Sequence, residues 1–205
     1  MASPRSSHFL IRRLHSLAGV IPVGVFLLLH LTLNATAIGG AEAYNRTIKL
    51  MATLPALIVL EWILIYIPLY FHAIYGIIVT LDARNNVLRY TYLRNWLFYL
   101  QRVSAYITLV FVSWHIWQLR IAKALGLVEP SFAEMVKIVH NPWWFAFYAL
   151  GVVAAVLHFT NGLFTFGITW GVTLGPRAQR VASYVWGVLF VAMSAAGVAA
   201  LLSFR

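Results

Sequence analysis

Four histidines lie at nearly constant intervals along this chain of 205 residues, each within a different long apolar stretch. They are His30, His72, His115 and His158, and the steps between them are 42, 43 and 43 residues. Histidine is a common axial ligand of haem iron, and ionisable groups at membrane depth are rare and usually functional. We therefore predict that these side chains form two pairs of axial ligands, which hold two haems for electron transfer across a membrane.

Membrane helices must position these side chains, because the composition is far from that of a soluble protein. Hydrophobic residues make up 62% of the chain and charged residues 10%, whereas soluble domains have about 45–50% and about 25%. A helix needs about 20 apolar residues to cross a bilayer. Five stretches reach this length, so we predict an all-α integral membrane protein, a single domain over residues 1–205 whose first four helices surround two stacked haems. The predicted helices are 14–37, 53–81, 96–120, 142–170 and 181–204.

The distribution of lysine and arginine predicts the orientation in the membrane. Nine of the fifteen lie in the N-terminal arm, around the loop between the second and third helices, and in the loop between the fourth and fifth. Positively charged residues favour the cytoplasmic side. We therefore expect the N-terminus in the cytoplasm and, after an odd number of helices, the C-terminus outside.

The chain contains no cysteine, which excludes disulfides, iron–sulfur ligation and covalent attachment of c-type haem. Any haem is therefore of the b type. The loops cannot form a nucleotide, flavin or dicarboxylate site, so chemistry on such substrates must belong to a partner. A net charge of +10 suits contact with anionic lipid headgroups, and we expect no nucleic-acid partner.

Depth in the membrane sorts the four histidines into two layers. At a rise of about 1.5 Å per residue, His30 and His115 lie roughly 22–26 Å from the cytoplasmic face, in the outer half. The second and fourth helices run in the opposite direction, which puts His72 and His158 in the inner half. We predict that His30 and His115 bind the outer haem and that His72 and His158 bind the inner haem.

A spacing of eleven residues indicates which residues face the opposite layer, because about three helical turns return to nearly the same face. Gly19 and Ser104 each precede an outer histidine by eleven residues, and Gly76 and Gly162 follow the inner histidines by four. Their small side chains predict close approach of a porphyrin edge. Small residues also serve ordinary contacts between membrane helices, which is the alternative explanation.

Glu61 is the one acidic residue inside a predicted membrane helix, and it precedes His72 by eleven residues. This spacing places it at the depth of the outer pair and aims it at the bundle interior. An unpaired carboxylate there is hard to justify for stability alone, so we predict that it transfers protons. The alternative is a neutral glutamic acid hydrogen-bonded to a neighbouring helix.

Several stretches carry a resemblance to a known family: Arg12-Arg13-Leu14-His15-Ser16-Leu17, the segment from Arg94-Asn95-Trp96 to Leu100-Gln101-Arg102-Val103, Ser113-Trp114-His115 and His158-Phe159-Thr160-Asn161-Gly162-Leu163. They resemble the cytochrome b558 subunit of bacterial succinate:menaquinone oxidoreductases, and the resemblance covers nearly the whole chain. It implies a protein of the bacterial cytoplasmic membrane that binds two b haems and anchors a flavoprotein and an iron–sulfur protein on the cytoplasmic side. It implies further that electrons pass from succinate through these partners and the two haems to menaquinone near the outer face. Glu61 would then correspond to a membrane carboxylate that the family has near the outer haem.

Three polar residues near the inner layer are candidate partners of haem propionates. His15 and Ser16 lie at the inner end of the first helix, and Arg102 lies at the start of the third. Each has a simpler interpretation, since His15 can cap the helix at the interface and Arg102 can extend its charge to the membrane surface.

Two other functions are compatible with parts of the sequence. A dihaem cytochrome b of a hydrogenase or formate dehydrogenase would also carry histidines on several helices, but not the stretches that support the resemblance. A transporter or a non-redox anchor would explain the helices and the basic charge, but not four histidines in two layers.

The loops carry one clear helix signal. Ser131 followed by Glu134 is a capping-box pattern, which predicts a short surface helix over residues 132–139.

Overall fold

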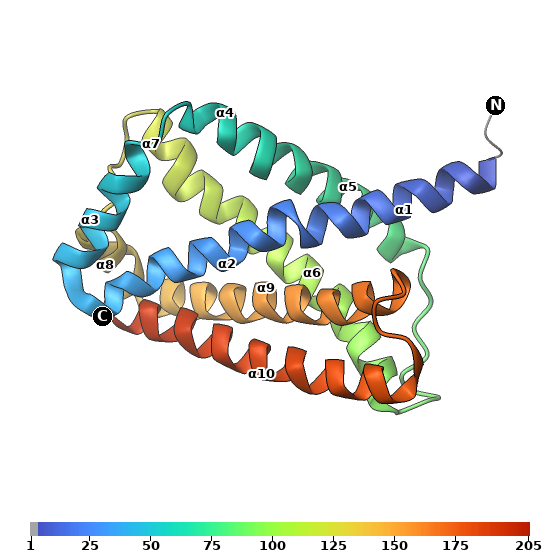
Figure 1. The fold of residues 1–205 in the computed structure, drawn as a ribbon. Helices are drawn as coiled ribbons and strands as arrows, with labels where there is room; N and C mark the ends of the chain where they lie inside the picture. Colours follow the sequence, from blue (N-terminus) through green and yellow to red (C-terminus); the bar gives the residue numbers. More distant parts are fainter. Residues whose placement is uncertain (1–3) are drawn as a thin grey trace.

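Helices and short connections make up the protein in the computed structural model, which describes residues 4–205 (Figure 1). In this part of the chain, five helical segments are long and apolar enough to cross a membrane. The predicted class, an all-α integral membrane protein with five membrane helices, is therefore confirmed. The segments are His8–Ala52, Leu57–Leu81, Leu93–Ala124, Pro142–Thr169 and Gly175–Leu202.

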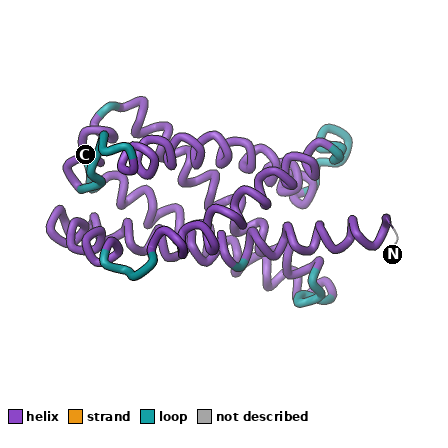
Figure 2. Tube along the Cα trace, turned by 90° about the horizontal axis from the view of Figure 1, so that it is seen from above, coloured by secondary structure: helices purple, strands orange, loops and turns teal. Residues whose placement is uncertain are grey.

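The two termini lie at opposite ends of the bundle (Figure 1). We call one end the N-terminal end; it carries the start of the first helix, the loop 82–92 and the turn 170–174. The other is the C-terminal end, where residue 205 lies beside the short helices of the connecting segments. Figure 2 shows the same elongated arrangement from above, with loops gathered at the two ends. Which end faces the cytoplasm stays a prediction.

The first membrane segment is longer and more divided than predicted. It consists of α1 (Pro4–Val20), α2 (Pro22–Asn34), the 3-10 turn η1 (Ala35–Gly39) and α3 (Gly40–Ala52). Proline fixes its own backbone and has no N–H to donate, so the helix restarts at Pro22.

Helix α3, which lies across the C-terminal end, was not predicted from the sequence (Figure 1). The signals were present: Glu42 in its first turn and Lys49 in its last turn match the helix dipole. A hydrogen bond of 3.0 Å from Arg46 to Glu42, four residues apart, also supports the helix.

The second and third membrane helices each contain one π-helical turn. The second comprises α4 (Leu57–Glu61), the π turn η2 (Trp62–Tyr66) and α5 (Ile67–Leu81). Pro68 is the second residue after η2 and cannot donate to the carbonyl four residues earlier, which explains the wider turn. The third comprises α6 (Leu93–His115), the π turn η3 (Ile116–Ile121) and α7 (Ala122–Ala124).

Helices α8 (Phe132–His140), α9 (Pro142–Thr169) and α10 (Gly175–Leu202) complete the fold. The predicted capping box is confirmed, because the Ser131 hydroxyl accepts the Glu134 N–H at 3.2 Å. The Asn141 side chain caps α9 in the same way, at 2.9 Å from the Trp143 nitrogen. Helix α9 packs against both α6 and α10 and is the best buried of the membrane helices.

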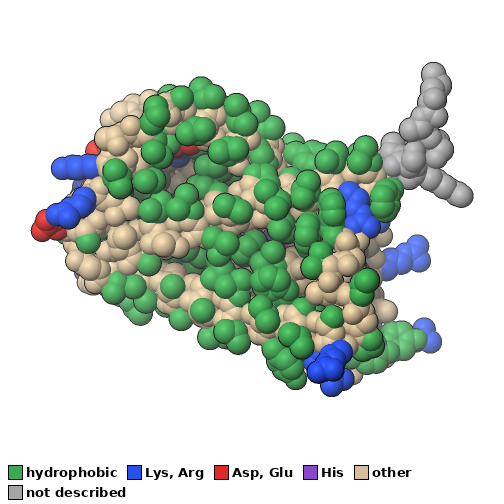
Figure 3. Space-filling model, viewed as in Figure 1, with side chains coloured by type: hydrophobic (Ala, Val, Ile, Leu, Met, Phe, Trp, Pro, Cys, Tyr) green, Lys and Arg blue, Asp and Glu red, His purple; other side chains and the backbone are tan. Residues whose placement is uncertain are grey.

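The surface has the character of a membrane protein. Hydrophobic side chains cover the length of the bundle in Figure 3, and lysine and arginine gather at its two ends. Every residue of Leu57–Leu81 keeps part of its surface exposed, so this helix presents apolar side chains outward along its whole length. Such an exterior is stable in lipid rather than in water.

Candidate functional site

The structure brings the four histidines together in two pairs, each formed between neighbouring membrane helices. The rings of His30 (α2) and His115 (α6) have centroids 5.7 Å apart and planes at 80°. The rings of His72 (α5) and His158 (α9) have centroids 6.0 Å apart and planes at 78°. The first pair lies toward the C-terminal end and the second toward the N-terminal end.

These separations fit two imidazoles that share one metal ion. Metal–imidazole bonds of about 2 Å on opposite sides put the two ring centroids roughly 6 Å apart. Imidazole nitrogen is also the donor that haem iron takes in b-type cytochromes. The donor set and the ring positions therefore fit two bis-histidine haems, one at each pair, and the ligand roles of His30, His115, His72 and His158 stay predictions.

His72 is held against the backbone of α1. Its Nδ1 donates to the His15 carbonyl at 2.9 Å, and its ring is stacked parallel on the His15 ring, with centroids 4.2 Å apart. Gly19 makes this approach feasible, because a Cβ atom there would lie 2.6 Å from Nδ1 of His72. With Nδ1 occupied as a donor, the lone pair of Nε2 is left for a metal ion.

His158 is fixed in the same way by α6, with Gln101 and Asn161 in supporting roles. The His158 Nδ1 donates to the Gln101 carbonyl at 3.1 Å, and the Gln101 amide donates back to the His158 carbonyl at 3.0 Å. The Asn161 amide donates to the Gln101 side chain at 2.7 Å. The Ser104 hydroxyl donates to the same Gln101 carbonyl at 3.2 Å. His72 and His158 are thus held in the same way, because a backbone carbonyl of another helix sets the tautomer of each.

Gln101 and Asn161 were assigned no role from the sequence, although both lie in the stretches that carry the resemblance. Their separation along the sequence does not predict the hydrogen bond between them, because this bond joins two different helices. A Cβ on Gly76 would be a tight 3.2 Å from His15 Nε2, whereas one on Gly162 would be an ordinary 3.6 Å from Gln101 Nε2. A close histidine contact therefore accounts for Gly76 but not for Gly162, and porphyrin approach stays a prediction.

Two of the candidate propionate partners have a polar side-chain atom without a hydrogen-bond partner among the described residues. Nη1 of Arg102 donates to Asn85 and to the Phe98 carbonyl, while its Nη2 is buried without a hydrogen-bond partner among residues 4–205. Nε2 of His15 is likewise buried and unpartnered within the described chain. Ser16 is half-buried beside it on α1. The orphaned Arg102 donor suits a group with anionic oxygens, such as a propionate, and His15 Nε2 does so in the tautomer that carries the proton on this nitrogen.

The other pair lies among aromatic rings. The His115 ring stacks on Phe111 at 5.6 Å and meets Tyr148 edge-on at 5.8 Å, and the His30 ring lies 5.3 Å from Phe26. Nδ1 of His115 is buried and has no hydrogen-bond partner in the described part of the molecule. This pair is therefore held by ring packing, whereas the other pair is held by backbone carbonyls.

Glu61 is paired with Arg120, contrary to the expectation of an unpaired carboxylate. Nε of Arg120 donates to Glu61 Oε2 at 3.0 Å and to Oε1 at 3.2 Å, and Nη2 donates to Oε2 at 2.5 Å. The side chains of Glu61 and Arg120 are 17% and 34% exposed. Tyr66 lies close enough to Arg120 for a side-chain interaction. Arg120 thus has an acidic partner in the bundle.

Both π turns border this ion pair. Glu61 is the last residue before η2, and Arg120 lies inside η3, which begins directly after His115. A π turn holds one residue more than an α-helical turn, so the helix beyond it is rotated by about 100°. The eleven-residue register between Glu61 and His72 assumed an unbroken α-helix, and η2 interrupts it. π turns are frequent at functional sites.

Two comparisons agree on the family. The family model for the succinate dehydrogenase/fumarate reductase transmembrane subunit matches residues 83–199. The succinate dehydrogenase cytochrome b558 subunit of Bacillus subtilis (strain 168) is 48% identical over 196 residues, which cover 96% of each chain. The protein therefore belongs to the family of succinate dehydrogenase and fumarate reductase transmembrane subunits, and within it to the cytochrome b membrane subunits.

Proposed function

We propose that the chain is a dihaem b anchor that carries electrons from an iron–sulfur partner subunit to menaquinone. The observation that carries the proposal is the two histidine pairs, with centroids 5.7 and 6.0 Å apart, on four successive membrane helices. The relative named as a cytochrome b558 subunit supports haem b as the group they hold. Succinate oxidation then takes place on a flavoprotein partner, because these loops offer no site for it.

The chain's own residues hold and orient the groups. His72 and His158 present Nε2 because the carbonyls of His15 and Gln101 take their Nδ1 protons. The unpartnered donors of Arg102 and His15 are placed to bind propionates on the same side of the bundle. A haem bound at each pair supplies a centre that accepts and releases one electron at a time.

A pyridine haemochrome assay on the purified complex tests this proposal. We expect two b haems for each copy of this chain. A ratio of one haem per chain, or none, would contradict the assignment of both histidine pairs.

Glu61 is proposed to exchange protons with quinone near the His30–His115 pair. Reduction of a quinone takes up protons as well as electrons, and a carboxylate within reach serves as acid or base. Figure 3 shows a hollow in this face of the molecule beside α4, with charged atoms visible inside it. In this arrangement Arg120 is a positioning residue that fixes the direction of the carboxylate.

The N-terminal end of the bundle is proposed to face the cytoplasm and to dock the partner subunits. It carries Arg84 and Arg89 in the loop after α5, and Arg177 at the start of α10. We expect photo-cross-linkers at these positions to reach the iron–sulfur subunit, and cross-linkers at Lys123 and Lys137 of the other end to miss it. The reverse result, measured by mass spectrometry of the products, would invert the topology.

Replacing Gly19 by alanine is expected to disturb the His72–His158 haem. The added Cβ would lie 2.6 Å from His72 Nδ1, so the ring must move off the His15 carbonyl. Overpacking of this kind costs about 1–3 kcal/mol. The haem content and the thermal loss of the haem absorbance measure the effect. Gly187→Ala is the matched control, because a Cβ at Gly187 meets nothing within 4 Å; equal behaviour of the two variants would show that this approach is unimportant.

A further inference from the structure

The π turn η3 is held from two sides by side chains of other membrane helices. Residues two positions apart on a helix point in nearly opposite directions, and Gln118 and Arg120 of η3 accordingly contact different helices. Arg120 pairs with Glu61 of α4. The Gln118 side-chain oxygen accepts the hydroxyl of Tyr148, a residue of α9, at 2.9 Å. The turn that follows His115 directly therefore links α4 to α9.

Tyr148 is deeply buried, and Gln118 satisfies its hydroxyl. The tyrosine is only 2% exposed. The same Gln118 oxygen also accepts from the Trp114 indole, one turn earlier on α6, at 3.1 Å. Two donors on one oxygen fix the direction of the Gln118 amide. A buried hydroxyl without an acceptor is costly in an apolar interior, so the bond between η3 and α9 is strongly favoured.

The ring of the same tyrosine packs against the proposed haem ligand His115. The two rings meet edge-on, with centroids 5.8 Å apart and planes at 73°. Phe111 stacks on His115 at 5.6 Å and also meets Tyr148 at 5.4 Å. A Cβ on Gly151 would collide with the Phe111 ring, which thus lies directly on the backbone of α9. Because Nδ1 of His115 has no hydrogen-bond partner among residues 4–205, these ring contacts set its orientation.

We propose that Tyr148 is a positioning residue that couples His115 to the neighbouring ion pair. Its ring fixes the plane of His115, and its hydroxyl, through Gln118, fixes the turn that carries Arg120. One side chain of α9 thus holds the haem ligand and the proton-transfer group Glu61 in a constant relative geometry. The inference rests on the proposed function for the roles of His115 and Glu61, whereas the mechanical link from Tyr148 to η3 does not depend on it.

Hydrogen–deuterium exchange of the purified complex tests the mechanical link. Tyr148→Phe keeps the ring against His115 and removes only the hydroxyl. The loss of one neutral hydrogen bond should speed amide exchange in η3 about fivefold. Gln118→Leu should speed it about tenfold or more, because the buried Tyr148 hydroxyl is then left without an acceptor.

Quinone turnover tests the coupling. In Tyr148→Phe, kcat with a soluble menaquinone analogue should fall about fivefold at unchanged KM, because the ion pair is less firmly held in its working position. In the Glu61→Gln background the same change should have no further effect, since Tyr148 acts through that pair.

The haem potentials test the role of the ring. Tyr148→Leu removes the ring as well as the hydroxyl. The midpoint potential of the haem at His115 should then shift while that of the other haem stays unchanged, because the surroundings of an axial ligand tune the potential.

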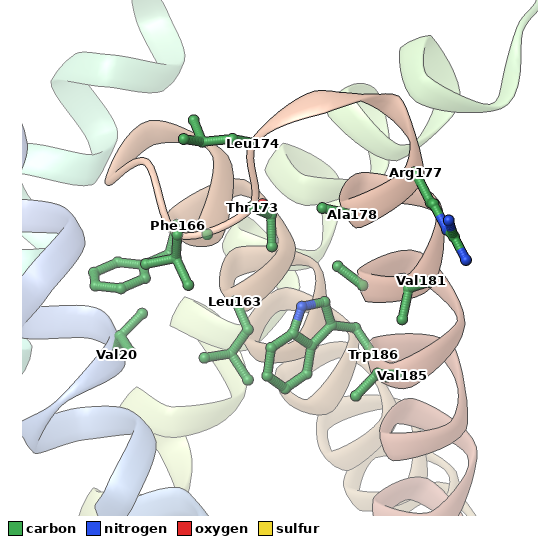
Figure 4. A pocket seen from close by; sticks show the side chains of 13 residues that line it. Val20, Leu163, Phe166, Thr173, Leu174, Arg177, Ala178, Val181, Val185 and Trp186 are labelled. Carbon is green, nitrogen blue, oxygen red and sulfur yellow. The ribbon is translucent and has the colours of Figure 1, made fainter.

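Tyr106→Phe and Leu163→Ala are the matched controls. Tyr106 also shares an interhelical hydrogen bond on α6, at 2.8 Å to Thr80 of α5, but it lies nine residues before His115. Leu163 lies on α9 itself, where its side chain points into the apolar groove at the N-terminal end (Figure 4). Both variants should leave amide exchange in η3 unchanged.

Three results would overturn the proposal. Native exchange in η3 of both Tyr148→Phe and Gln118→Leu would remove the mechanical link. Faster exchange with quinone turnover at the native level would refute the coupling, as would a further loss of turnover when Tyr148→Phe is added to Glu61→Gln. If His115 bound no haem, the proposed function would fail, but the exchange in η3 would still decide whether Tyr148 holds the turn.

Discussion

Alanine at His72 is expected to remove the same haem as alanine at His158, and the changes at His30 and His115 are expected to remove the other. The reason is geometric, since the two ring centroids of each pair lie within 6.0 Å and the two rings come from different membrane helices. Each variant should fall from two haems per chain to one. Redox titration of the reduced spectrum measures which component is lost, because the two surroundings differ.

The control for these four variants is His140→Ala, which changes an exposed histidine next to Asn141 and should keep both haems. Loss of different components within one pair would refute the pairing. A spectrum with both haems intact in any of the four would remove that residue from the ligand set.

Glutamine at Glu61 is expected to lower quinone turnover by about 10²-fold or more, the usual cost of losing an acid or base. The substitution keeps the size of the side chain and an oxygen that can still accept from Arg120. Both haems should remain, and reduction of artificial dyes by succinate should continue at its normal rate. Turnover with a soluble menaquinone analogue is the measurement.

Glu42→Gln is the matched control for this experiment. Glu42 also pairs with an arginine, Arg46, at the same end of the molecule, but its side chain is 88% exposed. Its replacement should leave every rate unchanged. If Glu61→Gln turned over quinone normally with both haems present, Glu61 would serve only to hold Arg120.

The sequence was sufficient for the membrane fold because apolar length and charge placement are local properties. The starts of the helices after Ser131 and Asn141 could be predicted for the same reason, since each capping side chain lies within three residues of the N–H that it binds. The relative depths of the four histidines followed from counting residues at a fixed rise per residue. These depths predicted the pairs that the structure shows, His30 with His115 and His72 with His158.

Contacts between helices could not be predicted from the sequence. The Glu61–Arg120 pair joins residues 59 positions apart, on two different helices, and no local pattern predicts such a contact. The Gln101–Asn161 bond depends on the rotation of α6 against α9. Helix α3 is a different case. Its charge pattern is a helix signal, but the two longer apolar stretches on either side of it dominated the prediction.

The paired π turns bear on how this protein family changes over evolutionary time. A π turn is equivalent to one inserted residue, so a single-codon deletion within Trp62–Tyr66 would restore a regular helix and rotate Glu61 by about 100°. Arg120, which lies four residues before the end of its membrane segment, would then lose its acidic partner. We therefore expect deletion of either extra residue alone to be disfavoured. We expect the extra residues of η2 and η3 to be gained and lost together among homologues. In an alignment of homologous sequences, a one-residue gap in the second membrane helix should therefore accompany a one-residue gap in the third.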